Sequence, residues 1–216
     1  MTLSAEHVAY SYPGSRTEVL SDVSFSMENT ECVTVMAPSG TGKTTFCQIL
    51  AGYRRPSRGK VLLDKSPLPE RGYCPVQMIW QHPELAVNPR LKMGKVLREG
   101  NRIEERIIKG LGIEADWCDR YPQELSGGEI ARFGIARALG EGTRFLIADE
   151  ITAMLDMVTQ SQIWNFLLEE LKSRQIGLLM VSHDAALVRC IRERFPRGGT
   201  DHGIEDWFIR QAAERE

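Results

Sequence analysis

A glycine-rich loop between an apolar strand and a helix constrains this chain more than any other feature of its sequence. The β-rich run Cys32–Met36 predicts a strand, and Lys43–Leu50 predicts a helix that ends before Gly52. A strand, a Gly-Lys-Thr loop and a helix in this order are typical of a phosphate-binding loop, or P-loop. A plain glycine-rich turn is the weaker alternative. The loop consists of Ala37, Pro38, Ser39, Gly40, Thr41, Gly42, Lys43, Thr44 and Thr45.

The residue types in this loop suit a nucleotide phosphate that carries Mg²⁺. Gly40 and Gly42 let successive backbone N–H groups face one concavity, and the helix N-terminus adds its positive dipole end there. Lys43 can reach the β- and γ-phosphates, and the Thr44 hydroxyl can ligate Mg²⁺. Ala37 stands where the motif has its first glycine, and alanine excludes only a positive φ at that position.

A second motif is an apolar strand that ends in two carboxylates. The run 145–148 is followed directly by Asp149 and Glu150. Open α/β sheets bind ligands at the carboxyl ends of their strands, so these acids are expected beside the P-loop. We expect Asp149 to hold Mg²⁺ through water and Glu150 to orient or deprotonate an attacking water. The alternative is that the pair only caps the next helix.

The alternation of strands and helices predicts an α/β fold with a mostly parallel sheet. Further strands are expected at 60–64, 144–148 and 177–181, and a helix with one apolar face at 160–171. The segment up to about Met27 reads as an antiparallel flank. A length of 216 residues fits a single domain over 1–216.

Composition excludes several other classes of protein. With 42% hydrophobic and 26% charged residues the chain is neither disordered nor collagen-like. A net charge of -2 gives no reason to expect a nucleic-acid partner, and the basic run Arg54, Arg55, Arg58 and Lys60 reads as a solvated turn. The five cysteines form no CxxC pair, so reduced thiols are expected. We find neither a signal peptide nor an apolar run near the roughly 18 residues of a membrane span.

A third motif gives the chain a specific resemblance. Ser126, Gly127, Gly128 and Glu129 precede a helix, and a Ser-Gly-Gly step at a helix N-terminus is an anion site that can contact a γ-phosphate. Between a P-loop and an Asp-Glu strand, this step resembles the signature loop of ABC ATPases. The resemblance runs from about Val8 to Val188, with six motifs in the family's order. It implies a P-loop NTPase core, an antiparallel β flank and an inserted helical subdomain at about 83–135.

Four further residues take their roles from this resemblance. Gln81 matches the Q-loop glutamine, which contacts Mg²⁺ and water, whereas Gln77 is expected in the preceding strand. His183 matches the switch histidine that contacts the γ-phosphate. Asp156 matches the end of the D-loop, which lies at the dimer interface. Tyr12 resembles the aromatic residue that stacks on adenine, and Tyr10 is the alternative for that role.

The resemblance also implies how such a chain works. Two ATPase subunits form a head-to-tail dimer in which the signature loop of one closes over ATP and Mg²⁺ held by the other. Closure moves transmembrane permease subunits, which places the chain at the cytoplasmic face of the cell membrane. The stretches 76–89, 121–128 and 148–164 are similar to importers of the dipeptide, oligopeptide and nickel type, which implies an extracytoplasmic solute-binding protein as well.

The chain departs from the family pattern in four places besides Ala37, one of which is the short region between Asp64 and Gln81. Ile151 replaces a usual proline, Glu129 replaces the commonest glutamine, and the tail 189–216 lacks the usual pair of strands. Instead the tail passes through 196–199 into an expected helix at 204–213. Neither Ile151 nor Glu129 removes a predicted phosphate or metal contact.

Three alternative functions compete with the transporter ATPase. A non-transport ABC ATPase acting on DNA or ribosomes usually has two cassettes or a coiled-coil insertion, and this sequence has neither. A regulatory module without hydrolysis would not need Lys43, Asp149, Glu150 and His183 together. A small-molecule kinase would not need the Ser-Gly-Gly step or His183.

Overall fold

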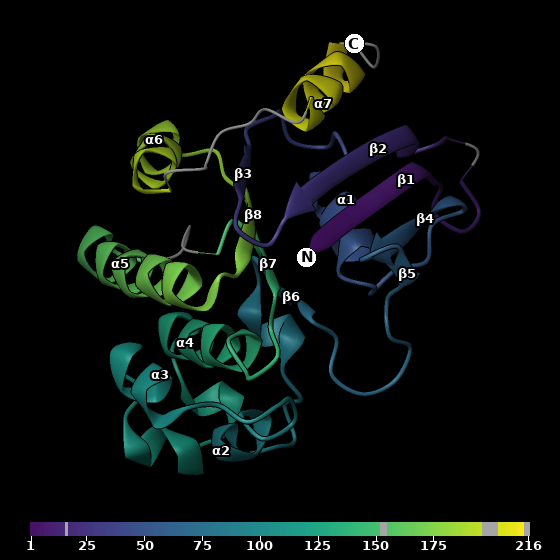
Figure 1. Cartoon of the computed structure of the whole chain (residues 1–216). Coiled ribbons are helices and arrows are strands. Elements are labelled where there is room, and N and C mark those ends of the chain that lie inside the picture. The colour runs from purple at the N-terminus through teal and green to yellow at the C-terminus, as the bar shows by residue number, and fades with distance from the viewer. Residues whose placement is uncertain (16, 152–154, 196–202, 214–216) are drawn as a thin grey trace.

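The computed structural model describes residues 1–15, 17–151, 155–195 and 203–213. It contains two four-stranded sheets with one helix between them (Figure 1). The antiparallel sheet has the order β2-β1-β4-β5, and the parallel sheet has the order β3-β8-β7-β6. The predicted α/β fold with an antiparallel flank is therefore confirmed. In the antiparallel sheet the strands are β1 (Thr2–Tyr10), β2 (Leu20–Glu28), β4 (Arg58–Leu63) and β5 (Ser66–Pro67).

The parallel sheet separates the two hydrophobic cores of the molecule. Its strands are buried on both faces, so alternate residues of one strand point into different cores. In β7, Phe145 and Ile147 pack with the core around α1, whereas Leu146 and Ala148 pack with the helices on the opposite face. The strands are β3 (Cys32–Val35), β6 (Val76–Ile79), β7 (Phe145–Asp149) and β8 (Gly177–Val181).

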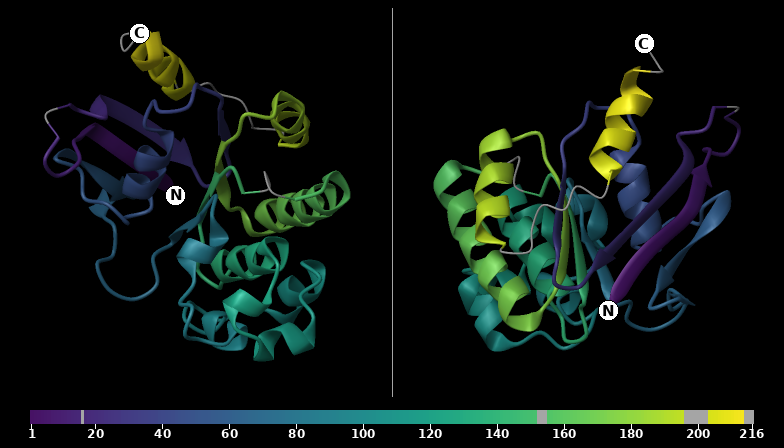
Figure 2. Two further views of the ribbon diagram at one scale, coloured as in Figure 1. Left: turned by 180° about the vertical axis from the view of Figure 1, so that it is seen from behind. Right: turned by 45° about the horizontal axis from the view of Figure 1, so that its top comes forward.

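Helix α1 (Lys43–Leu50) lies between the two sheets, and most other helices cover the far face of the parallel sheet (Figure 2). Seven of its eight residues are buried, because apolar side chains meet it from both sides. The helices on the far face include α4 (Gly127–Ala138), α5 (Met157–Arg174) and α6 (Ala185–Arg194). Among the described residues, no helix combines the length and the apolar character that crossing a membrane requires.

Short helices fill the segment between β6 and α4, where a helical subdomain is predicted. Its helix α3 meets α5 through an ion pair of Arg106 with the buried Glu170, and Gly110 lies against the ring of Phe166. These contacts attach α3, one of the short helices, to α5. The elements are the 3₁₀ turns Pro83–Ala86, Ala115–Asp119 and Pro122–Glu124 and the helices α2 (Met93–Val96) and α3 (Glu105–Gly110).

The described part of the tail is helical, as predicted. Helix α7 (Ile204–Ala213) follows α6, and no strand occurs after β8 in the described residues. Phe208 is buried against α1, with its ring centroid 5.9 Å from that of Phe46. Glu205 pairs with Arg192 of α6 at 3.0 Å. The segment 196–199, which the sequence places before this helix, lies outside the described residues.

Candidate nucleotide site

The P-loop connects the carboxyl end of β3 to the first turn of α1. Gly40 and Gly42 have φ angles of +81° and +99°, and Gly42 is the N-cap of α1. Only glycine adopts such angles without strain, so both glycines are needed for the turn. Ala37 has no positive φ. Its methyl group is therefore accommodated where the common motif has glycine.

Lys43 is the cationic centre of this loop. Its Nζ donates hydrogen bonds of 2.7 Å to the carbonyl oxygens of both Ala37 and Pro38, and Thr41 Oγ1 donates to Pro38 at 3.0 Å. The side chain is only 6% exposed. Burial lowers the pKa of Lys43, while the carboxylates of Glu150 and Asp149 oppose that shift. The loop thus wraps around an ammonium group that can contact phosphate oxygens.

Gly42 is the loop residue that tolerates substitution least. A Cβ at this position would lie 2.9 Å from Cγ1 of Val19 and 3.1 Å from its carbonyl oxygen. We expect Gly42→Ala to destabilise the chain by about 2–5 kcal/mol, since left-handed strain and overpacking add together. Urea unfolding monitored by circular dichroism measures the loss.

Gly14 supplies a matched control for that substitution. It also has a φ of +81°, but nothing lies within 4 Å of a Cβ built there. Gly14→Ala should therefore carry only the backbone strain, about 1–2 kcal/mol. Equal losses in the two variants would show that the contact of Gly42 with Val19 is not tight.

Asp149, the last residue of β7, is a buried carboxylate beside the P-loop. It is 2% exposed, and its Oδ2 has no hydrogen-bond partner among the described residues. Burial raises the pKa of Asp149, and the hydrogen bond with the Thr44 side chain opposes the rise. An unsatisfied carboxylate oxygen next to a hydroxyl is an oxygen-rich donor set of the kind that Mg²⁺ prefers. Both residues therefore offer oxygen atoms that would suit a magnesium ion.

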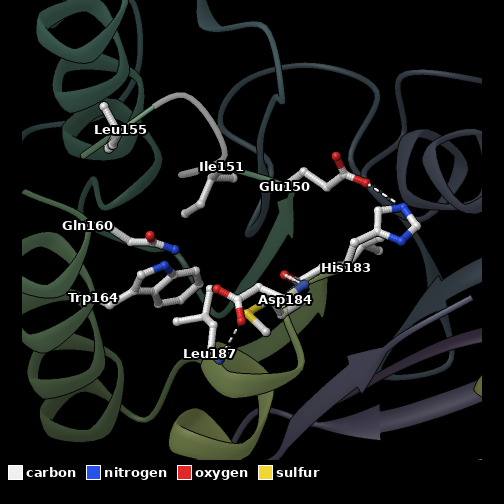
Figure 3. Close-up of a pocket in the computed structure, with 11 residues that line it drawn as sticks. Glu150, Ile151, Leu155, Gln160, Trp164, His183, Asp184 and Leu187 are labelled. Carbon is white, nitrogen blue, oxygen red and sulfur yellow. Dashed lines mark hydrogen bonds and ion pairs between the residues drawn. The ribbon is translucent and has the colours of Figure 1, made fainter. Parts of the chain in front are cut away.

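Glu150 links the Q-loop and the loop after β8. Gln81 Nε2 donates to its Oε2 at 2.7 Å, and His183 Nε2 lies 3.0 Å from its Oε1. Figure 3 shows the carboxylate and the imidazole ring pointing toward one another. The φ of Glu150 is +51°, an uncommon value for a residue other than glycine. Two residues assigned from separate motifs, Gln81 and His183, therefore converge on the carboxylate of a third.

These groups line one cleft of about 480 Å³. Tyr12 lies at its edge, where its hydroxyl is 2.9 Å from Thr45 Oγ1. Gln81 lines the cleft, whereas Gln77 lies in β6 with its side chain bonded to the Cys74 carbonyl. Predicted site residues in the lining are Tyr12, Ser39, Gly40, Gly42, Lys43, Thr44, Thr45, Gln81, Glu150 and His183.

Some residues near the cleft differ from the sequence prediction in their placement. Val19 lines the cleft although nothing in the sequence indicated it, since its place depends on the pairing of β1 with β2. Ala37, Pro38 and Thr41 are absent from the lining; the first two accept from Lys43, and Thr41 donates to Pro38. Asp149 lies beneath the lining, in contact with Thr44.

A second cavity of about 260 Å³ adjoins Glu150 and His183 (Figure 3). Leu187 and Trp164 contribute apolar walls, and Ile151 lines it while also packing into the core of the far face. The isoleucine that replaces the family's usual proline is therefore a buried core residue.

The signature step lies apart from this cleft. Ser126 is the N-cap of α4, and its Oγ accepts from the Glu129 N–H at 3.3 Å, while the Glu129 carboxylate accepts from the Ser126 N–H at 2.7 Å. Glu129 thus closes the capping box that glutamine can also make. Asp156 caps α5 by accepting from Val158 and Thr159 N–H groups. Within the described chain, residues 126–129 and Asp156 do not line the cleft.

Comparisons with known proteins agree with this geometry. Residues 20–153 match the family described as ABC transporter. An oligopeptide transport ATP-binding protein of Bacillus subtilis is 32% identical over 80% of this chain and 58% of its own length. A nickel import ATP-binding protein of Rhodospirillum rubrum is 31% identical over 82% of this chain and 69% of its own. The chain therefore spans between about half and two thirds of the length of the curated relatives it matches.

Solved structures show the same fold. A dimeric ATP-binding cassette bound to ADP and Pi superposes with a TM-score of 0.73 at 22% identity, over 87% of this chain and 90% of that one. A structure from Clostridium perfringens, part of an ABC transporter complex, has a TM-score of 0.67 at 25% identity, over 88% of this chain and 81% of that one. With a family match over more than half of its residues and relatives above 30% identity, this chain belongs to the ABC transporter family.

Proposed function

We propose that this chain is the ATP-binding and ATP-hydrolysing subunit of an ABC transporter. One observation carries the proposal: the Lys43 loop, the buried Asp149 and the Glu150 carboxylate with its two partners meet at one cleft. A cation for phosphates, an acid for a metal ion and a carboxylate for water are the parts that phosphoryl transfer requires. Their arrival from separate segments of the chain is hard to explain by structural roles alone.

Each residue of the cleft then has a task in binding or hydrolysis. The P-loop N–H groups and Lys43 hold the phosphates, and Tyr12 stacks on adenine. Thr44, Gln81 and Asp149 are proposed to hold Mg²⁺, which supplies charge neutralisation at the phosphates when bound. Glu150 orients the attacking water and accepts its proton. His183 contacts the γ-phosphate and keeps the Glu150 carboxylate in place.

The active form is proposed to be a head-to-tail dimer, with either a second copy or a paralogous chain. Residues 126–129 lie outside the cleft of their own chain, so their helix N-terminus is free to close on the nucleotide of the partner subunit. Asp156 and the exposed Met157 and Val158 lie at the start of α5, where the dimer interface is expected. A solved ATP-binding cassette of the same fold is dimeric, which supports a dimeric assembly.

A groove of about 740 Å³ is the proposed docking surface for the permease. It lies between the turn after α1 and the short helices, and its lining includes Tyr53, Leu68, Tyr73, Ala86 and Glu99. Tyr53 is 53% exposed, so a large aromatic side chain is available to a partner. Docking of multi-span permeases would place the chain at the cytoplasmic face of the membrane. The names of its relatives favour a peptide or nickel as the cargo. An extracytoplasmic solute-binding protein that delivers this cargo is part of the proposal.

Affinity purification of the tagged chain from gently solubilised native membranes tests this assignment. We expect multi-span membrane proteins to co-purify, together with a solute-binding protein. Tyr53→Asp should lower their recovery about tenfold or more, since it removes an aromatic anchor from the groove. Ile209→Asp on α7, also at an exposed apolar residue, is the control. Recovery of only ribosome or nucleic-acid factors would instead favour the non-transport class of ABC ATPases.

A further inference from the structure

Arg54 lies against the aromatic side chain at the edge of the cleft. Its guanidinium carbon is 5.1 Å from the ring centroid of Tyr12 and 5.8 Å from that of Tyr10. Both distances are within the range of cation–π attraction. Tyr12 lines the cleft, whereas Arg54 is not among the described residues of the lining. The guanidinium therefore contacts a cleft residue, although Arg54 does not itself line the cleft.

The guanidinium is itself held by neutral groups. Its Nη1 donates to the Tyr10 hydroxyl at 3.1 Å, and its Nε donates to Oε1 of Gln48, a buried residue of α1. The backbone N–H of Arg54 also donates to the Gln48 carbonyl at 3.2 Å. Arg54 is thus anchored to the same helix that begins at the P-loop.

Tyr12 is restrained by three contacts of different kinds. Its hydroxyl is bonded to Thr45 on the first turn of α1, and its ring makes an edge contact with Tyr10 at 5.2 Å and 83°. The third contact is the guanidinium of Arg54. Because the side chain is still 40% exposed, each contact reduces the number of orientations that the ring can adopt.

The other cations of the basic run have acidic partners. Arg55 pairs with Glu70 at 3.0 Å, Arg58 with Glu18 at 2.6 Å and Lys60 with Glu6 at 3.0 Å. Arg54 takes part in no ion pair within the described chain. Its charge is therefore directed at the two tyrosine rings and not neutralised by a carboxylate.

We propose that Arg54 is a positioning residue for the base of the nucleotide. The inference rests on the proposed function, because it concerns the same ATP site. Arg54 holds the Tyr12 ring at a fixed angle to the P-loop, so that a purine can stack on the ring while its phosphates reach Lys43. A fixed ring loses less conformational entropy on binding than a mobile one. Arg54 acts through Tyr12 and contacts neither the phosphates nor the water.

The test separates binding of the base from binding of the phosphates. Titration calorimetry would measure the Kd of a non-hydrolysable Mg·ATP analogue and of magnesium tripolyphosphate, which carries phosphates but no base. We expect Arg54→Gln to weaken binding of the ATP analogue about threefold to thirtyfold. Binding of tripolyphosphate should weaken less than about twofold. The KM for ATP should rise correspondingly, while kcat at saturating ATP stays near that of the wild type.

Two further variants sharpen the comparison. Arg55→Gln makes the same change of charge at the adjacent residue, whose partner is an exposed glutamate, and should bind both ligands as the wild type does. Arg54→Lys keeps a cation near the rings but loses the planar fork, so it should recover part of the ATP affinity. If Arg54→Gln weakens binding of both ligands equally, Arg54 stabilises the P-loop as a whole and does not position the base. That result would overturn the proposal.

Tyr12→Ala distinguishes failure of this inference from failure of the proposed site. If Tyr12→Ala weakens binding of the ATP analogue and Arg54→Gln does not, Arg54 has no positioning role. The assignment of the nucleotide site then still holds. If Tyr12→Ala binds the ATP analogue normally, the base does not stack there. That result would contradict both the assignment of Tyr12 and the role of Arg54.

Discussion

Glu150→Gln is expected to lower the rate of ATP hydrolysis by about a hundredfold or more while leaving ATP binding within a few-fold of the wild type. The amide keeps the size of the side chain but cannot accept a proton, and general-base catalysis is worth about 10²–10⁴ in rate. Phosphate contacts come from the P-loop and are unchanged. Phosphate release measures turnover, and calorimetry with a non-hydrolysable analogue measures binding.

Glu169→Gln is the matched control for this variant. Glu169 is an exposed residue of α5, so the same chemical change there should leave turnover as it is. Wild-type turnover in Glu150→Gln would mean that another group handles the water. The contacts of Glu150 with Gln81 and His183 would then serve only to join two loops.

Lys43→Ala is expected to weaken binding of Mg·ATP about tenfold to a hundredfold and to abolish measurable hydrolysis. The ammonium is the cation at the centre of the P-loop, and a charge-assisted hydrogen bond is worth about 1.5–3 kcal/mol. The free energy of unfolding should change little, because removing a buried charge offsets the loss of its two bonds to carbonyl oxygens. Calorimetry, phosphate release and thermal unfolding measure the three quantities.

Lys109→Ala tests whether the loss is specific to the P-loop. Lys109 is an exposed residue of α3 that pairs with Glu105. This variant should bind and hydrolyse ATP normally. Retention of ATPase activity in Lys43→Ala would remove the basis for the whole site assignment.

The local sequence pattern predicts the positions of several helices and strands accurately. The helix at 43–50, the strand at 177–181 and the tail helix at 204–213 match α1, β8 and α7. The strand expected at 60–64 begins two residues earlier, at Arg58, because pairing with β1 extends it. The helix expected at 160–171 is longer, Met157–Arg174, since Asp156 caps it and Gln175 ends it in a left-handed conformation. Apolar periodicity locates an element, whereas caps and partners set its ends.

The sequence pattern does not predict contacts between residues that are far apart in the chain. Nothing local to Glu150 indicates that its φ is positive or that Gln81 and His183 both reach its carboxylate. The packing of Arg54 on Tyr12 also depends on how the antiparallel sheet sits over α1, which motif spacing does not encode. The sequence predicts a solvated turn for Arg54, whereas in the structure Arg54 packs on two tyrosine rings. Its neighbours Arg55 and Arg58 do form ion pairs at the surface. The roles of the individual site residues stay predictions until the variants above are measured.

The burial of β3 has a consequence for the solubility of the chain. This strand is at the edge of the parallel sheet, yet all four of its residues are buried, because α6 and α7 pack on it and Arg192 donates to Thr34 at 2.6 Å. An uncovered edge strand is a template for pairing with another molecule and so for aggregation. Helices α6 and α7 therefore limit the pairing of foreign strands with this edge of the sheet.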